Sequence, residues 1–209
     1  MPPKSVVTKE QVIQAAIEIT RTEGSEAVTA RSVAAKLGVS THPIFTYYST
    51  LSELKADVLI RAREIYHEYI KRGMNEKIPF LGVGHQYLRL AQQEPELFKL
   101  LFLTSPDDSG AGAMEEYKFS LELVLDYVMK NYNMDRTTAE NYYMHLWLMS
   151  FSYSALIVTN DCPYTFEQMS SHLTQISLSL CKAYKEVPGF LTGEYDKDKI
   201  FSELVKKDG

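Results

Sequence analysis

Residues 29–54, TARSVAAKLGVSTHPIFTYYSTLSEL, constrain the fold of this chain more than any other segment. Apolar residues at helical spacing run up to Leu37 and are followed by Gly38, a residue suited to the left-handed turn that ends a helix. A brief second run surrounds Ile44, and a third begins near Leu54. Two short helices joined by a tight, glycine-containing turn form the helix-turn-helix arrangement that places its second helix in the major groove of DNA. The segment therefore predicts a DNA-binding head.

The second of these helices has the features of a recognition helix. Ser40 is a suitable N-cap, and we expect Pro43 to be tolerated in the first turn, where its missing N–H has no intrahelical partner. Ile44 and Tyr48 lie four residues apart and are expected to face the core together. Thr46 and Tyr47 then point outward. The alternative is an ordinary helical hairpin whose aromatic residues only fill a core.

Helix patterns dominate the rest of the chain, and no convincing alternating strand is found. Capping-box sequences begin at Thr8, Thr50 and Thr165, and Gly73 is expected to follow the end of the fourth helix. The fold class is therefore all-α: a three-helix head joined by a long helix to a larger helical domain. The expected helices cover residues 8–24, 29–38, 40–48, 50–72, 84–93, 95–103, 114–131, 135–159, 165–185 and 196–205.

Three domains are expected from these patterns. Residues 1–50 form the helix-turn-helix head, and residues 51–186 form a ligand-binding and dimerisation domain whose first helix, 51–72, links it to the head. Residues 187–209 form a tail with a short helix. Net charge supports the DNA-binding head only weakly: the chain carries −5 in all, of which residues 1–50 contribute +1 and the remainder −6. A basic footprint is the usual mark of a nucleic-acid-binding domain.

The N-terminal pattern resembles the signature of TetR-type transcriptional regulators. The resemblance rests on Val33-Ala34-(x)2-Leu37-Gly38-Val39-Ser40-(x)3-Ile44-Phe45-(x)-Tyr47-Tyr48-(x)5-Leu54 and covers roughly the first 70 residues. It implies a homodimer that binds a palindromic DNA operator as a repressor and releases it when a small effector binds. By position, the implied DNA-binding residues are Thr29 and Tyr47 at phosphates, Arg31 near the DNA backbone, Thr41, His42 and Thr46 near bases, and Ser40 as the helix cap.

Three positions depart from that signature. Phe45 stands where the family often has Tyr, and His42 stands where it often has a small residue. Leu51 occupies a position where the family usually has Lys; Lys55, one turn later, is a candidate replacement. We therefore expect fewer phosphate contacts and a shallower salt dependence of DNA binding. The alternative function is a helical small-molecule-binding protein with weak or lost operator binding.

The aromatic residues of the larger domain predict an apolar cavity or a core between helices. A stripe formed by Met144, Trp147, Phe151, Ala155 and Val158 is expected to face it, while neighbouring faces of 135–159 and 165–185 meet a second copy. His145 lies on another face and is expected at the surface or interface. An apolar or aromatic effector is expected to contact Tyr87, Phe98, Phe102, Tyr117, Leu121, Met144, Trp147 and Phe151.

Other classes of function find little support. Cys162 and Cys181 lack metal-like or redox-like spacing, so reduced thiols are expected, with a disulfide as the alternative. No catalytic constellation, metal-ligand spacing or cofactor motif is found, which argues against an enzyme. The apolar stretch at 146–159 is too short for a membrane span of about 20 residues. With no secretory pattern at its start, we expect a cytoplasmic protein whose partners are operator DNA, a small effector and a second copy of itself, and no membrane.

Overall fold

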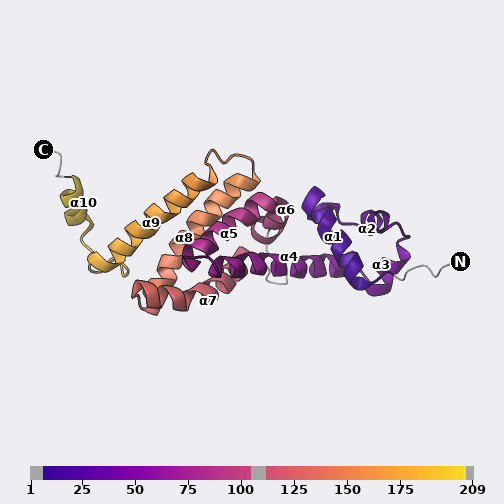
Figure 1. Cartoon of the computed structure of the whole chain (residues 1–209), viewed down its shortest axis with the longest axis horizontal. Coiled ribbons are helices and arrows are strands. Elements are labelled where there is room, and N and C mark those ends of the chain that lie inside the picture. Colours follow the sequence, from indigo (N-terminus) through magenta and orange to yellow (C-terminus); the bar gives the residue numbers. More distant parts are fainter. Residues whose placement is uncertain (1–6, 105–111, 206–209) are drawn as a thin grey trace.

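The chain is built from helices. A computed structural model describes residues 7–104 and 112–205, and these residues form helices and no strand. The all-α fold class is thus confirmed for the described part. The molecule is elongated, with α1, α2 and α3 at one end, α4 running from them into the body, and α10 at the opposite end (Figure 1).

The N-terminal head begins with a helix that the sequence delimits correctly. The Thr8 hydroxyl accepts from the Gln11 N–H at 3.2 Å, and the Gln11 side chain accepts from the Thr8 N–H at 2.9 Å, which completes the expected capping box. Gly24, at φ +85°, follows the last helical residue. The elements of the head are α1 (Lys9–Glu23), the 3-10 turn η1 (Ser25–Ala27), α2 (Ala30–Leu37) and α3 (His42–Tyr47).

The turn between α2 and α3 has the geometry that the sequence predicts. Gly38 adopts φ +68° and ψ +31°, the left-handed region that glycine enters without steric cost. Its N–H donates to the Ala35 carbonyl at 3.1 Å, and the Val39 N–H donates to the Ala34 carbonyl at 3.0 Å. These two bonds form a Schellman motif, which satisfies the last carbonyls of α2 and turns the chain toward α3.

The prediction of Ser40 as the cap of the recognition helix is wrong by one residue. Helix α3 begins at His42, and the preceding residue, Thr41, has helical angles and makes no side-chain cap. The Thr41 carbonyl instead accepts from the N–H groups of Ile44 and Phe45 at 3.1 and 3.4 Å. Because the first helical bonds end on the Thr41 carbonyl, Thr41 and not Ser40 is the residue before the helix.

Gly73 does not end the fourth helix, contrary to the sequence-based expectation. Helix α4 (Leu51–Met74) contains Gly73 and crosses α5 (Pro79–Gln93) at Gly82. A Cβ on Gly73 would lie 2.7 Å from the backbone of Gly82, and a Cβ on Gly82 would lie 2.3 Å from the Gly73 carbonyl oxygen. The two glycines are therefore present because the backbones of α4 and α5 touch, which no local sequence pattern reveals.

The capping arrangement at the start of α4 is only half of the expected box. The Thr50 hydroxyl accepts from the Glu53 N–H at 3.3 Å, as predicted. The Glu53 carboxylate, however, accepts from the N–H of Ser49 at 2.7 Å rather than from that of Thr50. A negative charge still lies at the first turn, where the helix dipole favours it.

The body packs α7, α8 and α9 around α5, and most of these helices have the predicted positions. Helix α5 starts five residues earlier than expected, at Pro79, because proline suits the first turn of a helix. The segment predicted as one helix over 95–103 divides into α6 and a π-helical turn. The remaining elements are α6 (Pro95–Phe98), η2 (Lys99–Leu103), α7 (Ala113–Tyr132), α8 (Arg136–Val158), α9 (Phe166–Glu186) and α10 (Lys197–Val205).

The buried surface of α8 differs from the predicted stripe. Trp147 and Val158 are buried, whereas Met144, Phe151 and Ala155 are only partly buried. The helix packs on α5, α7 and α9, so its buried surface is wider than one stripe. His145 is exposed, as expected, and hydrogen-bonds the Tyr184 hydroxyl of α9 at 3.1 Å. The buried residues of α8 are Ala139, Tyr142, Tyr143, Leu146, Trp147, Ser150, Tyr153, Ser154 and Val158.

Candidate DNA-binding head and ligand cavity

Helix α3, the predicted recognition helix, and Tyr48 directly after it divide their aromatic side chains between core and surface. Ile44 and Tyr48 are buried, which agrees with the predicted inward face. Phe45 is 53% exposed and Tyr47 is 38% exposed, so these two rings are not core. His42 and Thr46 are exposed as well. The helix thus presents most of its surface outward, which the hairpin alternative with a wholly aromatic core does not explain.

A small polar network holds α3 against α1 and α4. The Tyr48 hydroxyl donates to the Asp57 carboxylate at 2.9 Å, and the Lys9 ammonium lies 2.6 Å from the same carboxylate. Lys9 also lies over the Tyr48 ring, 5.2 Å from its centre. The hydrogen bond from Lys9 lowers the pKa of Asp57, while burial and the Asp57 charge raise the pKa of Tyr48. The orientation of α3 is therefore fixed by an ion pair as well as by apolar packing.

The Tyr47 hydroxyl is bonded within the protein in this structure. It donates to the backbone carbonyl of Val7 at 2.8 Å, so Val7, two residues before α1, lies beside the end of α3. The Thr46 hydroxyl donates to the His42 carbonyl at 3.1 Å. A phosphate that accepts from Tyr47 would replace the bond to Val7.

The other predicted DNA-binding residues differ in their exposure to solvent and in whether their polar groups already have a partner. Thr29 is exposed, and its hydroxyl caps α2 by accepting from the Ser32 N–H at 3.0 Å. Arg31 is exposed and takes part in none of the ion pairs found among the described residues. Lys55 is paired with Glu26 at 3.2 Å, so its availability to phosphate depends on breaking a surface ion pair. Ser40 is exposed and Thr41 is half-buried.

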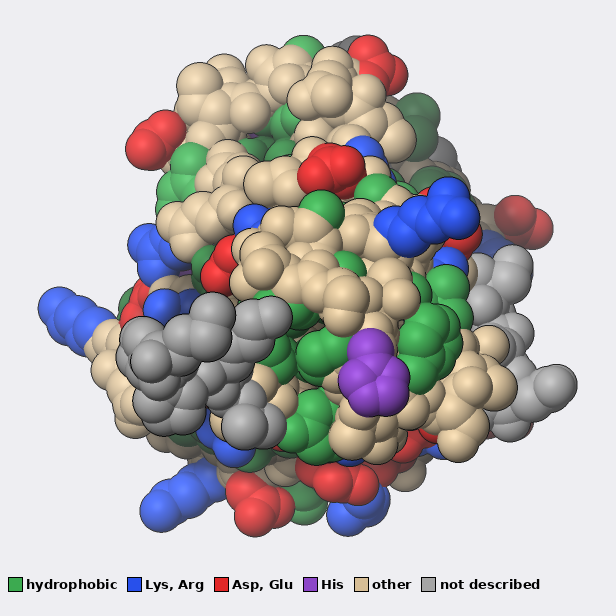
Figure 2. All heavy atoms as spheres, turned by 90° about the vertical axis from the view of Figure 1, so that its right-hand side faces the viewer, with side chains coloured by type: hydrophobic (Ala, Val, Ile, Leu, Met, Phe, Trp, Pro, Cys, Tyr) green, Lys and Arg blue, Asp and Glu red, His purple; other side chains and the backbone are tan. Residues whose placement is uncertain are grey.

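Residues 7–104 form no large basic patch on the visible surface at this end of the molecule. Figure 2 shows hydrophobic and uncharged polar surface in the middle of the face, with lysine, arginine and acidic side chains mixed around its margin. This distribution agrees with the weak charge asymmetry of the sequence, since residues 1–50 carry only +1. Affinity for DNA would then depend on few phosphate contacts.

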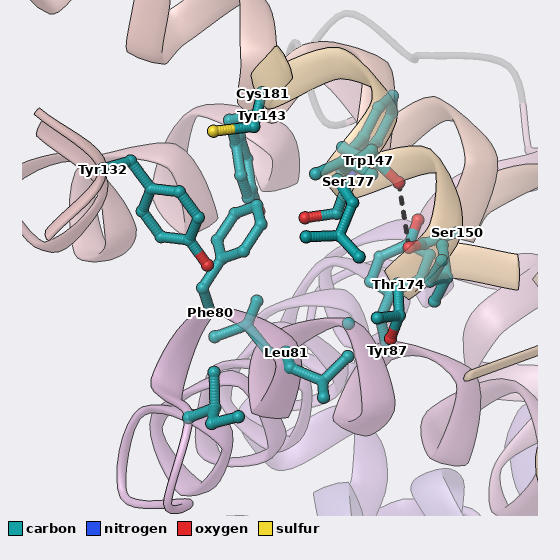
Figure 3. Close-up of a pocket in the computed structure, with 16 residues that line it drawn as sticks. Phe80, Leu81, Tyr87, Tyr132, Tyr143, Trp147, Ser150, Thr174, Ser177 and Cys181 are labelled. Atoms are coloured by element: carbon teal, nitrogen blue, oxygen red, sulfur yellow. Dashed lines mark hydrogen bonds between the residues drawn. The ribbon is translucent and has the colours of Figure 1, made fainter. Parts of the chain in front are cut away.

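A cavity of about 200 Å³ lies between α5, α7, α8 and α9. Phe80 and Tyr132 lie on one side of it, and Trp147, Ser150 and Thr174 lie on the other (Figure 3). None of its described lining residues is charged. They are Ile78, Phe80, Leu81, Val83, Gly84, Tyr87, Tyr132, Tyr143, Leu146, Trp147, Ser150, Leu173, Thr174, Ser177, Leu178 and Cys181.

The residues expected to contact a ligand are divided by the structure. Tyr87 and Trp147 line the cavity. Phe98, Phe102 and Tyr117 are buried in the aromatic core beside it, where Phe98 and Phe102 have ring centres 4.6 Å apart. The remaining three pack on that core while partly exposed: Leu121, Met144 and Phe151. A role for any of the eight in ligand binding stays a prediction.

Sequence reasoning missed the contribution of α9 to the cavity. Leu173, Thr174, Ser177 and Cys181 lie at spacings of three and four residues, which places them on one side of the helix. That periodicity is visible in the sequence, but the helix was expected only to face a second copy. Cys162 and Cys181 are not joined by a disulfide in the structure, and their reduced state stays a prediction.

A polar cluster joins α9 to α5 outside the cavity. His85 Nε2 lies 2.7 Å from the Ser170 hydroxyl, and His85 Nδ1 lies 3.5 Å from the Glu76 carboxylate. Burial lowers the pKa of His85, so the neutral imidazole is favoured near pH 7. In the tautomer whose proton is on Nδ1, facing Glu76, Nε2 accepts from the Ser170 hydroxyl. Glu76 also accepts from Gln86 and Arg89, at 2.9 and 3.0 Å, and its pKa is lowered by these partners against the opposing effect of burial.

One ion pair connects the long helix α4 to α7 of the body, and another connects α1 of the head to the body. Glu116 of α7 is almost fully buried and lies 2.8 Å from Arg63 and 3.1 Å from His67, both on α4. Arg21, near the end of α1, donates two hydrogen bonds of 2.8 Å to the Glu94 carboxylate between α5 and α6. The head is therefore attached to the body at two places, through α4 and through the packing of α1 on α6, which this bidentate pair accompanies.

Metal and membrane sites find no support in the described residues. They contain no group of three or more His, Cys, Asp or Glu side chains arranged to hold a metal ion. None of the described helices is long and apolar enough to cross a bilayer.

Comparison with solved structures identifies the fold, although the sequence comparisons find nothing. No family model and no curated protein matches the chain. A TetR-like transcriptional regulator from Rhodococcus sp. RHA1 matches with a TM-score of 0.61 and 12% identity, over 89% of this chain and 100% of that one. A TetR-family member from Streptomyces coelicolor A3 matches with a TM-score of 0.55 and 20% identity, over 80% and 96%.

A third solved structure with a similar fold contains a bound ligand. The multidrug binding protein EbrR, solved with imidazole, matches with a TM-score of 0.52 and 21% identity, over 80% of this chain and 88% of that one. All three identities are too low to show more than architecture. The chain has the fold of TetR-type transcriptional regulators.

Proposed function

We propose that this chain is a ligand-responsive transcriptional regulator that binds a palindromic operator as a homodimer. One observation carries the proposal: α3 follows a Schellman turn, is anchored by the buried Ile44 and Tyr48, and exposes the rest of its surface. A short helix held this way is suited to the major groove. Residues 1–50 act as the DNA-binding head, 51–186 as the ligand-binding and dimerisation domain, and 187–209 as a tail.

The proposed contacts divide into those that position the protein and those that read bases. Thr29, Arg31, Tyr47 and Lys55 bind the DNA backbone, which adds affinity without sequence preference. Bases are read from the first turns of α3, where Thr41, His42 and Thr46 lie. Ser40 adjoins the turn that sets the helix in place.

Pairing of two copies through α8 and α9 supplies the second recognition helix. Leu148 of α8 is 47% exposed and Leu178 of α9 is 66% exposed, and burial of such side chains against a second copy would be favourable. A two-fold dimer places its recognition helices about one turn of DNA apart, or a multiple of that spacing. The operator is therefore expected to be palindromic.

The effector is a small apolar or aromatic compound that occupies the cavity. The cavity has a volume of about 200 Å³, which is similar to the volume of about 150 Å³ of an engineered protein cavity that binds benzene. The imidazole bound to the similar EbrR structure is also a single ring. We therefore expect a ligand with one ring and small substituents.

The route from cavity to DNA follows the two attachments of the head. Phe80 and Val83 of α5 line the cavity, and the neighbouring Gly82 touches Gly73 of α4, so a shift of α5 displaces α4. The Glu94–Arg21 pair carries the same shift to α1. For the chain to act as a repressor that its effector releases, the ligand must bind the non-operator conformation more tightly.

An enzyme is the less favoured reading, although Ser170 contacts His85, which in turn lies near Glu76. Ser170 lies inside α9, where backbone N–H groups are already bonded to carbonyls four residues earlier. Acyl transfer needs free N–H donors aimed at the developing oxyanion. The triplet is better explained as a contact between α5 and α9.

The alternative is a helical small-molecule-binding protein whose operator binding is weak or lost. Phe45, Leu51 and the pairing of Lys55 with Glu26 favour it, because each reduces the number of phosphate contacts. A mobility-shift titration at low salt with DNA flanking the gene of this protein separates the two. The regulator gives a retarded complex that an effector dissolves. An intact dimer that shifts no fragment would favour the alternative. We propose that a regulator of this kind acts in the cytoplasm.

A further inference from the structure

The cavity walls combine aromatic surface with hydroxyl groups whose hydrogens are already used. The Ser150 hydroxyl donates to the Leu146 carbonyl at 3.0 Å, a bond drawn in Figure 3, and the Thr174 hydroxyl donates to the Ser170 carbonyl at 2.9 Å. A hydroxyl has one hydrogen and two lone pairs. Each of these two oxygens can therefore only accept a further hydrogen bond.

The donors near the cavity are placed differently. The Trp147 indole N–H and the Tyr87 hydroxyl have no partner among the described residues, but both atoms have almost no accessible surface. A ligand in the cavity meets the rings of these residues and not their polar atoms. The Ser177 hydroxyl shares a hydrogen bond with the Tyr142 hydroxyl, and either oxygen can be the donor. Ser150 and Thr174 therefore offer the ligand acceptors, while the hydroxyls of Ser177 and Tyr132 on the same wall can also donate.

Charge is excluded from the site by the same walls. No Asp, Glu, Lys, Arg or His occurs among the described lining residues. The wall formed by Thr174 and Leu178 is exposed, whereas Ser150 and Trp147 are buried. Transfer of a carboxylate or an ammonium to that buried end without a partner costs several kcal/mol, on the order of the penalty for burying an unpaired ion. A neutral ring is not penalised, and edge or face contacts with Phe80, Tyr143 and Trp147 favour it.

We propose that the cavity selects uncharged single-ring aromatic compounds that carry a hydrogen-bond donor, the chemistry of a phenol. The ring packs among the aromatic side chains, and its O–H donates to Ser150 or Thr174. This assignment rests on the proposed function, because it takes the cavity to be the effector site. It goes further by requiring a donor on the ligand and by excluding carboxylates and ammonium groups.

The full-length protein provides its own reporter for the test. Trp147 is the single tryptophan of the chain and lines the cavity, so its emission is expected to respond to an occupant. Phenol, its methyl ether anisole, toluene and benzoate are titrated, with calorimetry as a second readout. Anisole keeps the ring and the oxygen but has no hydrogen to donate.

The expected order is phenol first, with anisole and toluene about threefold to tenfold weaker, which is the range of one net hydrogen bond. Benzoate is expected not to bind where phenol saturates. Ser150→Ala combined with Thr174→Val should bring the phenol-to-anisole ratio close to one. Ser152→Ala is the matched control, because Ser152 makes the same bond to a carbonyl one turn earlier but is exposed on α8.

Three results would overturn the proposal. Equal affinities for phenol and anisole would remove the donor requirement while leaving the cavity as a ligand site. Binding of benzoate would remove the exclusion of charge. Failure of all four compounds would show that the cavity takes no single-ring ligand; the mobility shift without effector would then still report independently on the DNA-binding part of the proposed function.

Discussion

At the scale of single residues, Tyr47 shows how one hydroxyl can serve two partners. In the free protein it donates to the Val7 carbonyl, and we propose that in the complex it donates to a phosphate. The exchange replaces one hydrogen bond with another to a charged group, which is stronger. The contribution of Tyr47 to DNA affinity is therefore the difference in free energy between its hydrogen bond to phosphate and its hydrogen bond to Val7.

Tyr47→Phe should weaken binding to every DNA sequence alike, by about threefold to tenfold, because a phosphate contact carries no base information. Mobility-shift titrations with operator and unrelated DNA measure this. Phe45→Tyr is the complementary variant: Phe45 is 53% exposed, and the added hydroxyl should tighten binding to both DNAs. A change in sequence preference in Tyr47→Phe would contradict the assignment.

His85 makes stability depend on pH. Burial holds its pKa below the ordinary value of 6.5, although the Glu76 carboxylate opposes the shift and Arg89 adds to it. The unfolded chain therefore binds a proton more readily than the folded one below pH 6.5. The stability that neutral His85 contributes is present above this pH and is lost as the pH falls through the folded pKa.

Urea unfolding across a series of pH values tests this expectation. The free energy of unfolding should decrease as the pH falls below 6.5, and His85→Asn, which cannot titrate, should make that decrease shallower. His42→Asn is the control, since His42 is exposed on α3. An equally steep decrease in His85→Asn would assign the effect to other groups.

At the scale of elements, the crossing of α4 and α5 depends on two glycines. Gly73 and Gly82 allow backbone contact, so the long helix that carries the head is packed directly on the helix that lines the cavity. Larger side chains at these two positions would separate the helices, and the contact between them would then be made by flexible side chains. A direct backbone contact transmits a displacement with little loss.

Gly73→Ala should destabilise the protein by about 1–3 kcal/mol, because its Cβ would meet backbone atoms at 2.7 Å. Equilibrium unfolding in urea measures the change. Gly84→Ala is the matched control in α5: its Cβ would find its nearest neighbour, Leu173, at 3.7 Å, an ordinary contact. There the greater helix propensity of alanine should leave stability unchanged or raised.

At the scale of the whole molecule, the head and body are coupled by the bidentate pair of Arg21 and Glu94 in addition to α4. Because two attachments restrict the head more than one, we expect the pair to contribute to the ligand response. Coupling between sites in proteins is typically about 1–3 kcal/mol. A part of that energy is expected to pass through this contact.

Glu94→Gln should reduce, by severalfold, the factor by which ligand weakens operator binding, while the affinity for ligand without DNA changes less. Operator titrations with and without phenol measure the factor. Glu64→Gln is the control, because it breaks the Arg61–Glu64 pair within α4 and leaves the head-to-body contact intact. An unchanged factor in Glu94→Gln would assign the response to α4 and to the packing of α1 on α6, and not to the ion pair.

Much of the fold follows from local chemistry that the sequence displays. The capping boxes at Thr8 and Thr165, the left-handed Gly38 and the periodic apolar residues place the helices to within a few residues, because these features act over one or two turns. The inward orientation of Ile44 and Tyr48 follows from the same periodicity. The helix-turn-helix head was determined by the sequence for this reason.

The tertiary structure alone decided features that depend on distant contacts. Gly73 packs on Gly82 instead of ending a helix, and α9 supplies Thr174 and Ser177 to a cavity that was expected among other residues. Which face of a helix meets which neighbour is set by packing across the whole body, and no window of sequence contains that information. The sequence therefore determined where the helices are, and the packing of those helices decided where a ligand can bind.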